Sequence, residues 1–163
     1  CSLAKVLGGG LPIGAVCGSA EVMGMLQIKV DDPEWNRFQK VPHAGSYNGN
    51  GASSAAGNAV LEMVATGDPQ RHADAMTERL CNGFNFEGAK YGLGEVAFHR
   101  SSMFHLRTAE FANPLLRHML LNGVHIHRGT HGWGSAVHSP QDIDDTVAAF
   151  GKSLGDLRHE NEL

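Results

Sequence analysis

The sequence lacks the features that mark several special classes of protein. It has only three cysteines, Cys1, Cys17 and Cys81, and they lie far apart, so no disulfide framework is predicted and a reducing, cytoplasmic location is expected. Basic residues are scattered within a formal net charge of −4, which argues against a nucleic-acid partner. The chain has no apolar run long enough to cross a bilayer and no signal-peptide pattern, so no membrane partner is expected.

The chain has instead the composition of a globular protein with many tight turns. Hydrophobic residues make up 42% of its 163 residues, and 21 residues are glycine. This length fits one domain or parts of two. Because the chain begins with Cys1 directly in an apolar segment, we expect it to be a piece of a longer protein that is truncated upstream.

Local patterns predict the order of the elements in the first half. We expect short extended segments, a brief helix, a long polar loop and then two helices, the second with Asp68 as its N-cap. These elements are expected over residues 6–20, 21–28, 29–51, 52–67 and 68–84.

In the second half, alternating apolar residues predict strands, and amphipathic patterns predict helices with Asn113 and Ser139 as N-caps. The strands are expected over residues 93–101, 102–108, 124–128 and 133–138, and the helices over 113–123 and 139–157. This order favours a small α+β layer whose sheet packs against the helix at residues 140–155.

Lys5 is the only charged side chain between Cys1 and Ala20. Shortly after it come three consecutive glycines, which let a backbone approach a flat ligand closely. A lysine in apolar surroundings favours its neutral amine, the nucleophile that forms Schiff bases with carbonyl groups. The alternative is a lysine whose stem covers apolar surface while its ammonium group reaches water. The glycines match neither nucleotide-binding loop pattern.

A second stretch, HAGSYNGNGASSAAG at residues 43–57, is small and polar and leads into a helix. Free amide groups in such a stretch can bind an anion such as phosphate, and Ser46 can add a hydroxyl donor. The alternative is an ordinary capping loop.

The histidines raise the question of a metal site. His125 and His127 alternate on an expected strand and so share one face, and His131 and His138 follow shortly after. No carboxylate or cysteine accompanies them at metal-ligand spacing, so we expect no metal. Arg128 can hold a carboxylate through two hydrogen bonds, or it is a solvated surface residue.

Several stretches together resemble one family, in the right order. LAKVLGGGLPIGAVCGSAEVM resembles the region around the Schiff-base lysine of the class III, fold type I pyridoxal-phosphate aminotransferases. HAGSYNGNGASSAAGNAVLEM resembles their His-x-Gly-Thr-aromatic-x-x-Asn-Pro stretch. Weaker likenesses to the family's small domain follow at SMFHL, LLNGVHIH and SAVHSPQDIDDTVAAF. The most similar subgroup is that of glutamate-1-semialdehyde aminomutase.

The resemblance implies that Lys5 binds pyridoxal 5'-phosphate as an internal aldimine and moves a proton between the substrate and cofactor carbons. It implies that Gly45 and Ser46 hold the cofactor phosphate of the neighbouring subunit, and therefore a homodimer. The substrates would be an amino acid or amine and an oxo-acid or aldehyde, with Arg128 near the active-site entrance to bind a substrate carboxylate. Ser46 replaces the family's usual threonine and keeps its hydroxyl, whereas Gly51 replaces the usual proline, which loosens the loop.

The expected fold class is therefore α/β. Residues 1–67 would be the end of the large cofactor-binding domain, and residues 68–163 a small α+β domain. The family's phosphate-binding glycine loop, ring-stacking aromatic residue and pyridine-pairing aspartate would all lie upstream of Lys5. Two hypotheses follow: the chain is part of an aminotransferase or aminomutase, or it is a non-catalytic, truncated remnant of such an enzyme.

Overall fold

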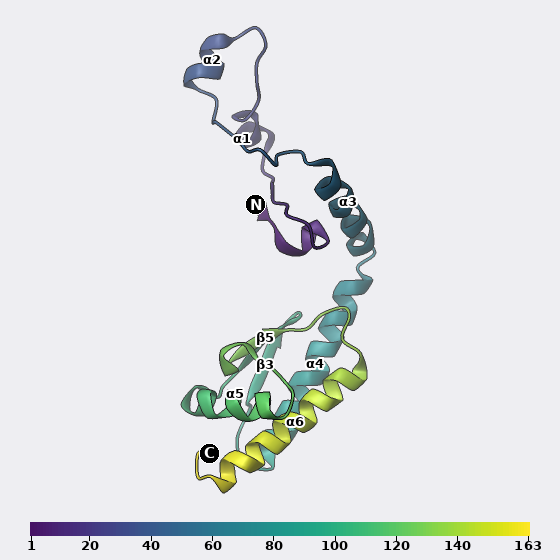
Figure 1. Ribbon diagram of the computed structural model, residues 1–163, viewed down its shortest axis with the longest axis vertical. Coiled ribbons are helices and arrows are strands. Elements are labelled where there is room, and N and C mark those ends of the chain that lie inside the picture. Colours follow the sequence, from purple (N-terminus) through teal and green to yellow (C-terminus); the bar gives the residue numbers. More distant parts are fainter. The chain divides into compact units, whose positions relative to one another are not determined.

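The computed structural model describes residues 1–163, apart from the surroundings of Gly129, and the chain divides into two units (Figure 1). Unit 1 is Cys1–Thr66 and unit 2 is Gly67–Leu163. The assignment of these units to the large-domain and small-domain segments of an aminotransferase remains a prediction. No helix within the described residues is long and apolar enough to span a membrane.

Unit 1 consists of short elements followed by one longer helix. Two short strands pair in antiparallel fashion, with Ser2 opposite Val16 and Leu3 opposite Ala15. The elements are β1 (Ser2–Leu3), the 3-10 turn η1 (Lys5–Gly8), β2 (Ala15–Val16), α1 (Ala20–Gly24), α2 (Pro33–Phe38) and α3 (Gly51–Ala65).

The sequence predictions for unit 1 are confirmed for its longest helix and are incomplete elsewhere. Helix α3 lies where the pattern at residues 52–67 predicts it. Helix α1 is shorter than predicted and ends at Gly24, because glycine is a poor helix former. The polar stretch at residues 29–51 contains the short helix α2, which begins with Asp32 as its N-cap and Pro33 as its first residue.

Unit 2 combines a three-stranded sheet with three helices. The strand order is β3-β4-β5, all antiparallel, and Phe98, His105 and His131 lie opposite one another across the three strands. The elements are α4 (Asp68–Ala89), β3 (Ala97–Arg100), β4 (Met103–Leu106), η2 (Ala109–Phe111), α5 (Ala112–Leu121), η3 (His127–Gly129), β5 (His131–Trp133) and α6 (Pro140–His159).

Several predicted boundaries in unit 2 are wrong. The N-cap of α4 is Gly67, in a left-handed conformation with φ of 75°, and not Asp68. Helix α5 follows directly from the turn η2, so Phe111 and not Asn113 occupies its N-cap position. Residues 124–128 form no strand, because the backbone turns into η3 and Arg128 takes a φ of 52°.

The prediction for α6 is confirmed in its capping details. The backbone N–H of Asp142 donates to Ser139 Oγ at 3.2 Å, and the backbone N–H of Ser139 donates to Asp142 Oδ2 at 2.7 Å. These reciprocal bonds form a capping box. The Ser139 N–H and the Ser139 hydroxyl, which both donate to Asp142 Oδ2, lower the pKa of the Asp142 carboxyl group.

The core of unit 2 centres on aromatic and aliphatic residues from all three helices and the sheet. Phe84 of α4 packs on Phe150 of α6, with ring centroids 4.2 Å apart, and meets Phe104 of β4 edge-on at 6.2 Å. Helix α4 is the close helical neighbour of β3 and β4, whereas α6 packs on α4 and α5. The expectation that the sheet packs against residues 140–155 stays a prediction, although Phe104 of β4 and Phe150 of α6 belong to the same buried cluster. Gly88, near the end of α4, lies close to Val96, since a Cβ there would be only 2.9 Å from its side chain.

Two leucines on the same helix provide a matched test of this core. Leu115 is fully buried and Leu121 is 76% exposed. Leu115→Ala should lower the free energy of unfolding by about 2–5 kcal/mol, because it removes buried methyl groups and leaves a cavity. Leu121→Ala should change it by no more than about 0.5 kcal/mol. Urea unfolding of both variants checks this, and equal losses would contradict the packing of α5 described here.

Candidate functional site

Lys5 lies at the start of η1, in a backbone conformation that most residues avoid. Its φ is 59°, and it is one of four non-glycine residues with positive φ among those described; Arg128 is another. Left-handed conformations of this kind cost a residue with a side chain roughly 1–2 kcal/mol. The Lys5 side chain is exposed, as are its neighbours along the first six residues. The apolar surroundings expected from the sequence are thus not supplied by the fold of unit 1.

The glycines after Lys5 hold its segment against helix α3. A Cβ at Gly57 of α3 would lie 3.2 Å from the Leu7 carbonyl oxygen, and a Cβ at Gly9 would lie 3.1 Å from Val60 Cγ2. At Gly8 a Cβ would lie 2.7 Å from Ile13 Cγ2. The close approach predicted for these glycines therefore exists, but in unit 1 the partner is a helix of the same chain.

The loop before α3 is shaped by two successive turns. The backbone N–H of Asn48 donates to the Gly45 carbonyl oxygen at 3.0 Å, and that of Asn50 donates to the Tyr47 carbonyl oxygen at 3.1 Å. A Cβ at Gly45 would lie 2.7 Å from Asn48 Oδ1, so a larger residue there would require the Asn48 side chain to move. Asn50 then caps α3 by accepting the Ser53 N–H at 3.0 Å.

A polar hollow of about 450 Å³ lies beside this loop at the beginning of α3. Its lining offers hydroxyl, amide and imidazole groups and consists of Pro12, Ile13, Gly14, His43, Tyr47, Asn48, Gly49, Asn50, Ser53 and Ser54. The positive end of the helix dipole adds to the attraction for an anion. Gly45 and Ser46 lie in the same loop, exposed, but outside the lining of the hollow.

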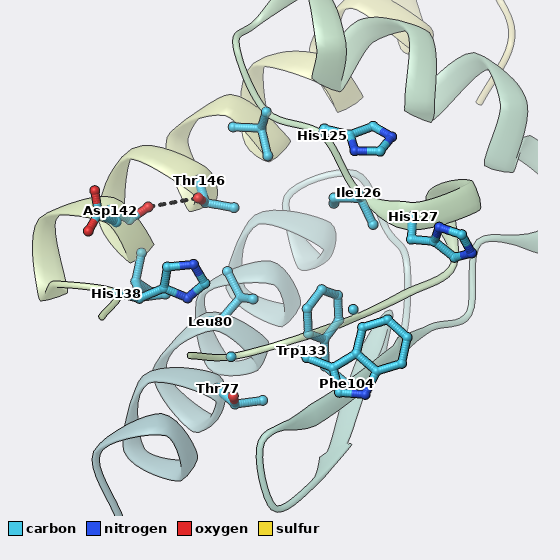
Figure 2. Close-up of a pocket in the computed structure, with 14 residues that line it drawn as sticks. Thr77, Leu80, Phe104, His125, Ile126, His127, Trp133, His138, Asp142 and Thr146 are labelled. Atoms are coloured by element: carbon cyan, nitrogen blue, oxygen red, sulfur yellow. Dashed lines mark hydrogen bonds between the residues drawn. The ribbon is translucent and has the colours of Figure 1, made fainter. Parts of the chain in front are cut away.

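Unit 2 has a separate hollow of about 410 Å³. His125, His127 and His138 line it together with Trp133 and Asp142 (Figure 2). His125 and His127 thus face one hollow although they are not on a strand. Arg128 is exposed and does not belong to this lining.

His131 lies within a row of imidazole rings on the sheet. Its ring centroid is 4.9 Å from that of His127 and 5.8 Å from that of His105. Loss of hydration lowers the pKa of His131, and the neighbouring His127, His105 and Arg128 lower it further. Among the described residues, the potential metal ligands that converge within 4.8 Å are not these histidines but His118, Glu160 and Glu162.

The pattern that defines the class III aminotransferases matches residues 1–129, which include the Lys5 segment, the loop and most of the sheet. The chain belongs to this family. Its structure is similar to a transaminase with PLP bound, with a TM-score of 0.81 and 26% sequence identity over 99% of this chain and 39% of that one. A β-phenylalanine aminotransferase from Variovorax paradoxus is also similar, with a TM-score of 0.66 and 26% identity.

In sequence, this aminotransferase-family chain is similar to glutamate-1-semialdehyde 2,1-aminomutases. It is 31% identical to that of Pyrobaculum aerophilum and 30% identical to that of Pyrobaculum arsenaticum, in each case over 98% of this chain and 40% of the relative. The chain therefore spans about two fifths of the length of these relatives.

The predicted site residues are divided between the two units. Lys5, Gly45 and Ser46 all belong to unit 1, where α3 supports both segments, and Arg128 belongs to unit 2. Sequence reasoning did not identify Asn50 as the cap of α3, although asparagine just before a helical pattern is a recognised N-cap signal. The left-handed backbone of Lys5 has no such signal, since the residue is not glycine.

Proposed function

We propose that this chain is part of a pyridoxal-phosphate-dependent enzyme that transfers an amino group, with Lys5 as the residue that binds the cofactor. The proposal is supported chiefly by the position of Lys5. The Lys5 side chain is exposed, and its backbone is left-handed. The segment after Lys5 packs on α3 at glycines, and it lies within the region that matches the class III aminotransferases. Backbone strain of this kind is concentrated at functional sites.

The groups present in unit 1 fit the two ends of this cofactor. The primary amine of Lys5 suits its aldehyde, and the amide and hydroxyl groups near the start of α3 suit its phosphate. When bound, the cofactor withdraws electrons from the substrate carbon beside the nitrogen. Lys5 Nζ would take the proton from that substrate carbon and deliver it to a carbon of the cofactor. The Gly45 N–H and the Ser46 hydroxyl would donate hydrogen bonds to a phosphate of the neighbouring subunit of a homodimer.

The substrates proposed are an amino acid or amine as donor and an oxo-acid or aldehyde as acceptor. The similarity to aminomutases supports transfer within one molecule, and the similarity to transaminases supports transfer between two. Arg128 would bind a substrate carboxylate through its guanidinium group.

A second candidate is a non-catalytic remnant of such an enzyme. Comparison of the isolated 163-residue chain with the longer polypeptide distinguishes the two. If the chain works only within a longer polypeptide, it should bind pyridoxal phosphate weakly when alone, and the longer polypeptide should bind it tightly and turn over substrate. A longer polypeptide without turnover would favour the remnant.

Replacing Lys5 tests the central role in the longer polypeptide. Lys5→Ala should lower the amino-transfer rate by at least roughly 10²–10⁴-fold, because that is the usual contribution of a positioned proton-transfer group. Lys29→Ala is the control, since the Lys29 ammonium group lies over the Trp35 ring at 3.5 Å and has no proposed catalytic role. Normal turnover in the Lys5 variant would contradict the proposal.

Ser46 offers a paired test of the phosphate contact. Ser46→Ala should weaken cofactor binding roughly 10-fold or more, because one hydrogen bond to a charged group is lost. Ser46→Thr, which restores the family's usual residue and keeps the hydroxyl, should bind as tightly as the original. Equilibrium dialysis of the cofactor measures both, and equal affinities in the alanine and threonine variants would exclude a hydroxyl contact.

Arg128 has a separate kinetic test. Arg128→Ala should raise KM for substrates that carry a carboxylate roughly 10- to 100-fold, because a charge-assisted pair is lost. KM for a matched amine without a carboxylate should not change, and cofactor binding should be retained. Arg100→Ala, another exposed arginine of unit 2, serves as the control. An unchanged KM for carboxylate substrates would assign Arg128 to the solvated surface.

A further inference from the structure

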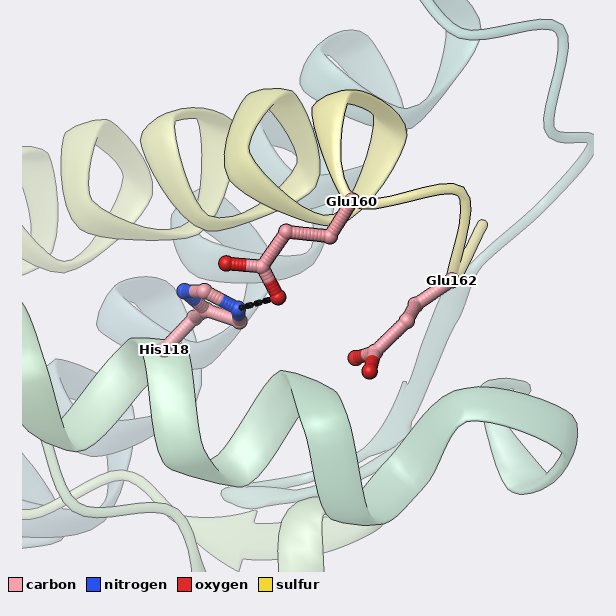
Figure 3. A group of neighbouring side chains, drawn as sticks. All are labelled: His118, Glu160 and Glu162. Atoms are coloured by element: carbon pink, nitrogen blue, oxygen red, sulfur yellow. Dashed lines mark hydrogen bonds and ion pairs between the residues drawn. The ribbon is translucent and has the colours of Figure 1, made fainter.

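A compact group of ligand side chains lies where α5 meets the end of α6. His118, near the end of α5, is only 5% exposed, and Glu160 follows directly after α6 (Figure 3). Asn161 takes a left-handed φ of 59°, and the Glu162 N–H then donates to the Leu157 carbonyl oxygen at 2.9 Å. The chain reversal at Asn161 brings the Glu162 side chain next to Glu160, so that both carboxylates lie beside the His118 imidazole.

The ligand atoms of His118, Glu160 and Glu162 all lie within 4.8 Å of one another. His118 Nε2 is 3.2 Å from Glu160 Oε2. We propose that these three side chains bind a divalent transition-metal ion of the zinc class. Imidazole and carboxylate ligands suit zinc, and three protein ligands with an open fourth position are a common arrangement for it.

Two features of the surroundings support this assignment. Asp156 Oδ2 lies 3.7 Å from Nδ1, the other nitrogen of His118, where an outer carboxylate commonly orients a metal-binding imidazole. A hollow of about 350 Å³ opens beside the group and is lined by His118, Asp156, His159 and Glu160 among others. It leaves room for a water molecule as the fourth ligand.

Arg117 is the competing cation. Its Nη2 lies 3.0 Å from Glu160 Oε2 and 3.0 Å from Glu162 Oε2, so it bridges the two carboxylates. One guanidinium group neutralises only one of these two negative charges, whereas a divalent ion neutralises both. Binding of the metal therefore requires Arg117 to move into solvent, which its half-exposed side chain permits.

Titration calorimetry of the full 163-residue chain with zinc chloride tests the proposal. The original chain should bind one zinc ion at this site. Glu162→Gln should weaken this binding by more than roughly 10-fold, because a direct ligand matters at least as much as an outer-shell partner. Glu110→Gln, an exposed acid of η2, should leave it unchanged. Arg117→Gln should strengthen it, because the competing cation is removed.

Two outcomes would overturn the site itself, and a third, with magnesium, would overturn its zinc class. One is no zinc binding by either the original chain or Arg117→Gln. The other is equal binding by Glu162→Gln and Glu110→Gln, which would place the ion elsewhere. Magnesium chloride should bind far more weakly than zinc, since magnesium prefers oxygen ligands alone, and equal binding would contradict a site of the zinc class. None of these readouts involves pyridoxal phosphate, so failure here leaves the proposed amino transfer unaffected.

Discussion

The position of the Lys5 segment in unit 1 depends on the close packing of residues 7–9 on helix α3, which glycines make possible. Gly57 admits the Leu7 carbonyl oxygen to the helix surface, and Gly9 fits beside Val60. The same helix begins at the loop that holds Gly45 and Ser46. One helix therefore packs on the segment after Lys5 and also follows the loop that holds Gly45 and Ser46, and a larger residue at Gly9 or Gly57 would disturb the packing of the Lys5 segment on this helix. The left-handed turn at Lys5 lies directly before this packed segment.

The elements that could be predicted from the sequence are those with strong local signals. Helix α6 has Ser139, Pro140 and Asp142 in the order that a capping box requires, and the structure forms that box. Strand β4 shows the alternation expected of a sheet with one covered face, with Phe104 and Leu106 buried, whereas in β3 only Ala97 is buried. The glycine-rich motif after Lys5 indicated the family together with the later stretches in the right order, because its residues are contiguous and chemically unusual.

The remaining features depend on tertiary contacts, which local patterns do not specify. Residues 124–128 alternate as a strand would, with Ile126 buried and Val124 packed against the core, but the left-handed turn at Arg128 ends any extension. The close approach of α4 to Val96 at Gly88, where a Cβ would lie 2.9 Å from the Val96 side chain, is not revealed by sequence periodicity. His118 and Glu160 are 42 residues apart, so no sequence-spacing rule predicts that they meet. They are neighbours because α5 packs against α6.

Borohydride reduction in the presence of pyridoxal phosphate, followed by peptide mass mapping, tests the role of Lys5 most directly. Reduction makes the bond between a lysine amine and the cofactor permanent, so the labelled peptide identifies the residue that binds it. In the longer polypeptide proposed to contain this chain, the cofactor mass should appear on the peptide that carries Lys5 and its three glycines. Label on Lys29, Lys40, Lys90 or Lys152, with the Lys5 peptide unmodified, would contradict the assignment.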